Sequence, residues 1–180
     1  MPDLAIKNPV LEASGDLPGY PGLCLNEVAG DGLWSMQSSD TLKLEAFASI
    51  VFKQHTKMGA MLATDELRLI QFAPGKAYLF SDQCQFPGKA ADFETIATDI
   101  SHGFCQLLLS GDDALKFLNA YTTVDLEDEA ITTAKCLRTR LGQYAITLWW
   151  DKLSDIHILV DRSLARSLGS YLQRLSMRWF

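Results

Sequence analysis

The second half of the chain constrains the fold most, because turn, cap and strand signals follow one another there in close order. Ser110 lies between an apolar run and a helical pattern, with Asp113 three residues later, which is the spacing of a capping box. Gly142-Gln143 predicts a tight turn, and an apolar stripe over Leu164–Leu175 predicts a final helix. Four segments have the length and composition of β-strands: Phe104–Leu109, Cys136–Leu141, Tyr144–Trp150 and Ile156–Val160.

Upstream, the same kinds of signal are spaced more loosely. Leu67–Phe72 and Ala77–Phe80 flank a Pro-Gly turn and predict a hairpin. Ala46–Phe52 is apolar and bulky and predicts a strand, whereas the spacing in Ala90–Asp99 predicts a short helix. The resulting order, β-β-β-α-β-α-β-β-β-α, indicates the α+β class. We expect two interlocked ferredoxin-like β-α-β-β units that share the Phe104 strand, with an extended N-terminal arm.

The predicted arm covers residues 1–43, where proline and glycine interrupt regular elements. Apolar residues such as Leu23, Leu33 and Trp34 are interleaved with them. A single α+β domain is predicted over residues 44–180. The arm lays its apolar side chains either on the chain's own domain or on a partner subunit, and the sequence leaves both alternatives open.

Composition excludes several classes of protein. Hydrophobic residues make up 48% of the 180 residues and charged residues 21%, which is typical of a globular domain. The formal net charge of -6 argues against a nucleic-acid partner, because such proteins neutralise phosphates with basic side chains. No apolar run approaches the ~18 residues of a membrane span, and the first residues lack a signal-peptide profile. We therefore expect a cytoplasmic protein whose four cysteines are free.

No residue cluster has the pattern of a catalytic or metal site. His102 follows Ser101 in a turn, where a structural hydrogen-bonding role is favoured over a site role. Acidic residues gather over Asp125–Glu129 without the spacing of a calcium loop, so a solvated loop is favoured. We predict no catalytic residue and no metal ligand. Arg138 and Arg140 alternate along one strand face, where they hold either a ligand carboxylate or an ordinary ion pair.

Large aromatic residues are the candidates for contact with a partner protein. Trp149 and Trp150 are adjacent in a predicted strand and point to opposite faces, so one is expected in the core and the other at the surface. The predicted contact residues are Trp34, Trp149, Trp179 and Phe180.

Several short segments, taken in order, resemble the sarcosine oxidase gamma-subunit family, which belongs to the folate-binding aminomethyltransferase-like fold group. The first holds an Asp-x-Ser-His turn, an apolar strand and a Ser-Gly-x-x-Ala helix start. The others match the family's Val/Leu-Asp-Leu, Thr-Arg-Leu, Leu-Val-x-Arg-Ser-x-Ala and hairpin segments. In this chain the five segments are Asp99–Ala114, Val124–Leu126, Arg138–Gly142, Ile158–Ala165 and Leu69–Leu79.

The resemblance implies a non-catalytic gamma-type subunit of a heterotetrameric, tetrahydrofolate-linked sarcosine oxidase. The chain would assemble with alpha, beta and delta subunits. FAD, FMN, NAD and tetrahydrofolate would lie in those partners, and this chain alone would bind no cofactor. Two alternatives remain open: a stand-alone folate or small-molecule binder that uses Arg138 and Arg140, and an independent small enzyme. Self-association of the isolated chain also remains open.

Overall fold

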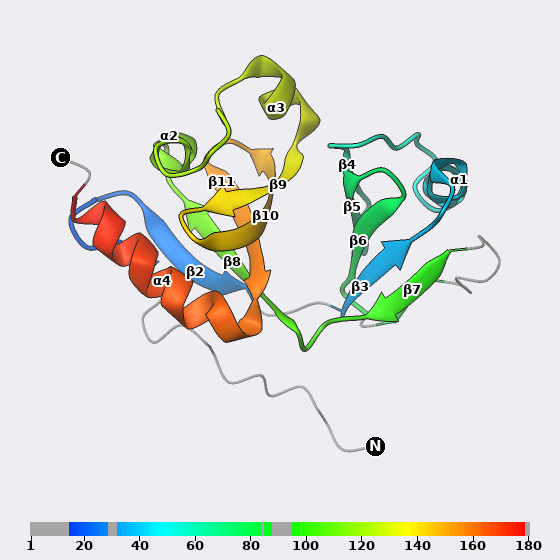
Figure 1. The fold of residues 1–180 in the computed structure, drawn as a ribbon, viewed down its shortest axis with the longest axis horizontal. Coiled ribbons are helices and arrows are strands. Elements are labelled where there is room, and N and C mark those ends of the chain that lie inside the picture. Colours follow the sequence, from blue (N-terminus) through cyan, green and yellow to red (C-terminus); the bar gives the residue numbers. More distant parts are fainter. Residues whose placement is uncertain (1–14, 29–31, 84, 88–94, 179–180) are drawn as a thin grey trace.

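The computed structural model describes residues 15–28, 32–83, 85–87 and 95–178. Within these residues the chain forms two antiparallel sheets (Figure 1). In order across the sheet, sheet A contains β1 (Gly15–Asp16), β2 (Cys24–Val28), β8 (Phe104–Ser110), β11 (Asp155–Asp161), β10 (Tyr144–Lys152) and β9 (Cys136–Leu141). Sheet B contains β4 (Met61–Ala63), β5 (Leu67–Ala73), β6 (Lys76–Ser81), β3 (Gly32–Gln37) and β7 (Ile96–Asp99).

Helices cover the outer faces of the two sheets, and the inner faces meet. The helices are α1 (Thr41–Val51), α2 (Ala114–Asn119), α3 (Glu129–Ala134) and α4 (Arg162–Ser176). Residues of α2 and α4 share one buried core with sheet A, and residues of α1 share a second core with sheet B. A third core lies between the sheets. The layers run helix, sheet, sheet, helix (Figure 1), and the predicted α+β class is confirmed.

Strand β10 shows how sequence alternation separates two of these cores. Ile146, Leu148 and Trp150 point to the core shared with α4, whereas Trp149 points to the core between the sheets. Both tryptophans are buried, with 0% exposure for Trp149 and 1% for Trp150. Both faces of this strand are therefore covered, which explains its continuous apolar sequence.

The strand predicted over Ala46–Phe52 is instead part of helix α1. Leu44, Phe47 and Ala48 are fully buried at helical spacing on sheet B. The helix begins after Asp40, whose Oδ1 accepts a 2.9 Å hydrogen bond from the Leu42 backbone N–H. The capping aspartate and the apolar residues spaced three and four apart favour a helix. In this segment they outweigh the strand preference of its bulky residues.

Two further predicted elements differ from the structure. Residues 90–94 of the helix predicted over Ala90–Asp99 lie outside the described residues, and its last residues form strand β7, which pairs with β3. Ser110 does not cap α2, because it ends β8 and pairs with both neighbouring strands. Helix α2 begins at Ala114, and the Asp113 carboxylate accepts a 2.6 Å hydrogen bond from the Tyr20 hydroxyl.

The first 43 residues are not a separate arm where the structure describes them. They contribute β1 and β2 to sheet A, β3 to the interior of sheet B, and the start of α1. The side chains of Leu23, Leu33 and Trp34 are buried in the chain's own cores. These residues therefore pack on the chain's own domain and not on a partner subunit. Along the chain, β1 and β2 belong to sheet A, β3 to β7 form sheet B, and β8 to β11 belong to sheet A again. The ferredoxin-like description is not confirmed, because the Phe104 strand belongs to sheet A alone.

Candidate functional site

The layer of side chains between the two sheets brings together residues from distant parts of the sequence, and we call it the inter-sheet seam. Its buried members are Leu33, Ile70, Tyr78, Phe80, Cys136, Trp149 and Leu159, with Met61, Phe72, Ile100 and Phe104 packed against them. Their rings form two contact series. Trp149 contacts Phe80 with ring centroids 5.0 Å apart, and Tyr78 lies 4.5 Å from Phe72 and 5.9 Å from Phe104. The seam is therefore an aromatic joint between the sheets.

Polar groups lie in one part of the inter-sheet seam. The ring of His157 stacks on Trp149, with centroids 5.0 Å apart and an interplanar angle of 5°. Its Nδ1 lies 3.0 Å from Nε2 of Gln106, an amide that donates to an unprotonated ring nitrogen. Arg68 reaches Asp151 at 3.7 Å, and this pair is partly solvent-exposed and therefore weak. Within the described residues, Nε of Arg68 and Nε1 of Trp149 are buried donors without a hydrogen-bond partner.

The titratable groups of the seam are held in their uncharged forms. Burial raises the pKa of the Cys136 thiol to about 12, and the thiol contacts the carbonyl oxygens of Ala60 and Gln71. Burial also raises the pKa of Tyr78, with Arg138 lowering it and Asp161 raising it. A protonated thiol and a protonated phenol are poor nucleophiles at neutral pH. The seam therefore has the chemistry of a packing layer.

His157 makes the stability of the fold depend on pH. The pKa of His157 is lowered to about 4, mainly by burial and also by Arg68, whereas Asp151 and Asp155 act to raise it. In an unfolded chain the pKa is about 6.5, so between pH 6.5 and 4 the unfolded state binds the additional proton. Stability should therefore fall as the pH falls through this window, by about 3 kcal/mol at most.

Urea unfolding of the wild-type protein and of His157→Gln, between pH 7 and pH 4, tests this expectation. The variant should lose less stability than the wild type across the window. His55→Gln is the control, because the His55 side chain is 86% exposed, and it should keep the wild-type pH profile. Parallel profiles for wild type and His157→Gln would contradict the assignment.

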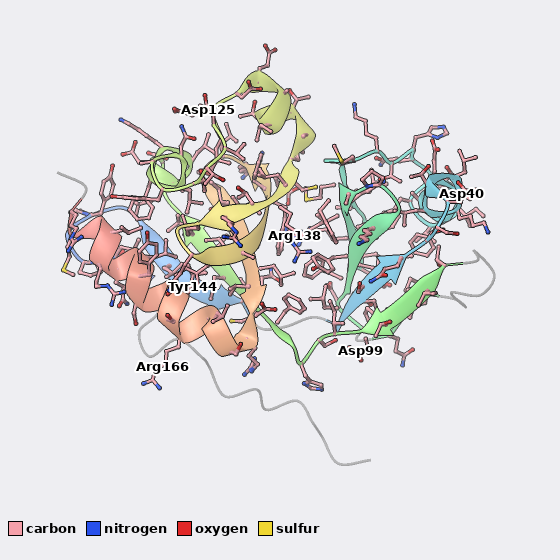
Figure 2. All side chains as sticks on the ribbon, viewed as in Figure 1. Asp40, Asp99, Asp125, Arg138, Tyr144 and Arg166 are labelled. Atoms are coloured by element: carbon pink, nitrogen blue, oxygen red, sulfur yellow. The ribbon has the colours of Figure 1, made fainter. Side chains whose placement is uncertain are left out.

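The two predicted arginines lie at the border of the seam. Arg138 and Arg140 share the inner face of β9 with Cys136, as the alternation predicts, and both are exposed. The Arg138 guanidinium lies over the Phe72 ring, 5.5 Å from its centroid, and Figure 2 places Arg138 between the two halves of the molecule. No ion pair of the described residues uses either arginine.

The burial of Trp34 and Trp149 contradicts their prediction as contact residues. Trp34 is 7% exposed beneath α1, and Trp149 is 0% exposed in the seam. Neither offers its side chain to a partner in this fold. The expectation that one of Trp149 and Trp150 lies at the surface is wrong, because β10 is covered on both faces. Trp179 and Phe180 lie outside the described residues.

The Asp99–His102 segment is a turn. Ser101 Oγ accepts a 2.8 Å hydrogen bond from the Leu33 backbone N–H and donates to Asp99 Oδ1 at 2.6 Å. His102 is exposed. These bonds join the start of β3 to the connection that leads from sheet B back to sheet A. Ser101 therefore has a structural role in this turn, and the structural role favoured for His102 stays a prediction.

The acidic segment includes a helix that the sequence did not predict. Asp128 caps α3 by accepting a 2.8 Å hydrogen bond from the Ala130 backbone N–H. The Asn119 amide donates to Asp125 and Glu127 at 3.2 Å each, which anchors the preceding loop. In the part of the chain that the structure describes, no group of three or more potential metal ligands occurs. None of the described helices has the length and apolar character needed to span a membrane.

Exposed apolar side chains concentrate in the half of the molecule built on sheet B. Among the described large apolar residues, the four most exposed are Ile96 at 71%, Leu42 and Ile50 at 66% each, and Met58 at 62%. Leu42 and Ile50 both belong to α1 and lie outside the set of Leu44, Phe47 and Ala48 that packs on sheet B. The exposed part of α1 that carries Leu42 and Ile50 is the surface that a partner would most favourably cover.

Comparison with known proteins shows the fold. No family model and no curated protein matches the sequence. The chain is similar to a chain of the heterotetrameric sarcosine oxidase from Corynebacterium sp. U-96, solved with pyrrole 2-carboxylate, at a TM-score of 0.70 and 16% identity, over 87% of this chain and 85% of that one. It is also similar to the glycine cleavage system aminomethyltransferase T from Bartonella henselae, at a TM-score of 0.55 and 15% identity, over 86% of this chain and 46% of that one. The aminomethyltransferase-like fold predicted from the resemblance is confirmed.

Proposed function

We propose that this chain is a non-catalytic, gamma-type subunit of a sarcosine oxidase-like heterotetramer that demethylates sarcosine or a related N-methyl amino acid. One observation carries the proposal: the structural match to a chain of a heterotetrameric sarcosine oxidase extends over 87% of this chain and 85% of that chain. The match to aminomethyltransferase T covers only 46% of that enzyme. The likeness is therefore greater to one subunit of an assembly than to a complete enzyme.

The chemistry of the seam supports a role in assembly. Cys136 and Tyr78 have raised pKa values and His157 a lowered one, so all three are uncharged at neutral pH. None is poised as a nucleophile or a general base. In this proposal FAD, FMN, NAD and tetrahydrofolate belong to the alpha, beta and delta partners, and the complex is cytoplasmic.

Co-expression of the tagged chain with the flavoprotein subunits of a sarcosine oxidase-type complex from the same source tests the proposal. The chain should elute with the alpha, beta and delta subunits in one peak that carries flavin absorbance. Leu42→Glu combined with Ile50→Glu should weaken co-elution, because it places charges on the exposed side of α1. The matched control, Leu153→Glu with Leu164→Glu, changes two less exposed leucines outside that surface. Elution of the wild-type chain alone would contradict the proposal.

A stand-alone folate binder is the second candidate, and the exposed pair Arg138 and Arg140 favours it. Two guanidiniums on one strand face suit the carboxylates of a glutamate tail. Calorimetric titration of the isolated chain with tetrahydrofolate decides this point. Saturable heat that disappears in Arg138→Gln with Arg140→Gln would favour the binder over the subunit, and a flat titration would exclude it.

A further inference from the structure

Helix α4 carries a row of arginines on its solvent-exposed side. Positions four residues apart form a continuous ridge along an α-helix, because each is turned only about 40° from the one before. In α4 and the turn that follows it, one such ridge consists of Arg162, Arg166, Ser170, Arg174 and Arg178. The last four of these residues are exposed, and Arg162 is half-buried. We call Arg166, Ser170, Arg174 and Arg178 the arginine ridge.

The ridge lies opposite the side of α4 that packs on sheet A. Ala165, Leu168 and Leu172, which are three and four residues apart, are buried in the core that α4 shares with this sheet. Figure 2 shows Arg166 extending from α4 away from sheet A. The row continues past the end of the helix, because the Arg178 backbone N–H donates to the Leu175 carbonyl oxygen at 2.9 Å. The ridge therefore takes no part in the packing of α4 on sheet A.

The charge of this segment is opposite to that of the whole chain. Positions 162–178 hold four of the sixteen lysine and arginine residues and none of the 22 acidic residues, although the net charge of the chain is -6. An exposed helix is stabilised by opposite charges three or four residues apart, whereas Arg162 and Arg166 are like charges at that spacing. The helix dipole also disfavours cations in the first turn, and it favours only Arg174 in the last turn. The stability of α4 alone therefore does not explain the ridge.

The end of the ridge is not neutralised within the part of the chain that the structure describes. No acidic side chain there forms an ion pair with Arg174 or Arg178 within 4.0 Å. Neighbouring cations repel one another, so a surface that brings several carboxylates to the ridge lowers its electrostatic energy. Arginine binds a carboxylate through two parallel N–H groups, and the small side chain of Ser170 leaves room between the arginines for such a group.

We infer that the arginine ridge docks on an acidic face of a partner protein. A nucleic acid suits the ridge less well, because the net charge of -6 repels the phosphates beyond it. A membrane also suits it less well, because the apolar side of α4 is buried in the core and cannot enter a lipid surface. The ridge is separate from the exposed part of α1, since α1 and α4 belong to opposite outer layers (Figure 1). The inference deepens the proposed function and rests on it for the identity of the partner.

Binding of fluorescein-labelled poly-L-glutamate to the full chain at low ionic strength tests this inference. The ridge variant is Arg166→Gln/Arg174→Gln/Arg178→Gln, which should fold like the wild type because glutamine and arginine have similar helix propensities. It should bind about tenfold more weakly than the wild type. The loss should lie in a slower association rate and a weaker dependence on salt, because exposed charges act mainly on the encounter of the two molecules. Affinity for the co-expressed flavoprotein subunits should fall in the same way.

Two control variants separate charge from position. Lys53→Gln/Lys57→Gln/Lys76→Gln removes the same charge from exposed positions in the half built on sheet B, and it should bind like the wild type. Lysine at the three arginine positions of the ridge keeps the charge and should weaken binding less than glutamine does. Leu153→Glu with Leu164→Glu leaves the ridge intact, because Leu164 does not fit its four-residue spacing.

The outcomes separate this inference from the proposed function. A wild-type chain that binds poly-L-glutamate through the ridge but elutes without the flavoprotein subunits would remove the proposed function and keep the docking surface. A ridge variant that assembles with those subunits at wild-type affinity would overturn the docking surface and keep the proposed function. No binding of poly-L-glutamate by the wild type, or equal losses in the ridge and lysine-to-glutamine variants, would also overturn it. Tighter ridge-dependent binding of duplex DNA would assign the ridge to a nucleic acid and overturn it as well.

Discussion

Trp149→Ala is expected to lower the free energy of unfolding by about 3–5 kcal/mol, because it opens a cavity between the two sheets. Trp149 is fully buried, its ring centroid lies 5.0 Å from that of Phe80, and His157 stacks on it. Alanine reaches neither ring. Domains of this size have a total stability of about 5–15 kcal/mol, so the variant should be close to the limit of folding.

Thermal and urea unfolding measure this loss, which corresponds to a fall in Tm of about 6–20 °C. Trp150→Ala is the matched control, because it removes an equally buried ring from the opposite face of the same strand. Both variants should lose similar stability, but only Trp149→Ala should raise the pKa of His157 toward its ordinary value, since it lets water reach that ring. A His157 pKa that stays low in Trp149→Ala, measured by NMR titration, would contradict this account of the seam.

A second variant separates the ring from its polar group. Trp149→Phe keeps an aromatic ring in contact with Phe80 and His157, and it removes the indole N–H, which has no hydrogen-bond partner in the described residues. Removing an unpaired buried donor offsets part of the lost packing. The loss of stability should therefore be well below that of Trp149→Ala. Equal losses would show that the indole N–H is satisfied in solution.

The sequence predicted the second half of the fold well because its signals are local. Strands β9, β10 and β11 appear where runs of strand-forming residues are separated by two short turns, and the hairpin of β5 and β6 appears around Pro74-Gly75. Helix α1 was predicted as a strand because Phe47 and its neighbours are bulky. The helical spacing and the Asp40 cap carried the correct signal. Where residue type and residue spacing disagree, spacing decided this element.

The seam could not be predicted, because it depends on which strands pair and which faces meet. Alternation correctly placed Arg138 and Arg140 on one face and Trp149 opposite Trp150. It could not show that the face with Trp149 would be covered by sheet B. The stack of Trp149 on His157 requires the register of β10 and β11, and the contact of Arg138 with Phe72 requires both sheets. Both contacts depend on tertiary packing. Phe72 and Arg138, for example, are more than sixty residues apart in the sequence.

Gly111→Ala should also destabilise the protein strongly, by more than about 3 kcal/mol. Gly111 has a φ of +138°, which side chains rarely adopt, and an added Cβ would overlap the Gly22 carbonyl oxygen and lie 3.0 Å from Leu23 Cδ2. The backbone has little freedom to move, because the Gly111 N–H donates to the Ser154 carbonyl at 2.8 Å and its own carbonyl accepts from Ala114 at 3.0 Å. The residue therefore joins β8, the turn before β2 and the turn before β11.

Gly22→Ala is the matched control, because Gly22 has a φ of +94° and an added Cβ would meet nothing within 4 Å. It should lose only the backbone strain, about 1–3 kcal/mol. The difference between the two variants in urea unfolding measures the cost of moving the Gly22 carbonyl away from position 111. If Gly111→Ala is no less stable than Gly22→Ala, the segments around Gly22 and Gly111 can move apart without a loss of stability. In that case the close approach of β8 to the N-terminal segment would not contribute to the stability of sheet A.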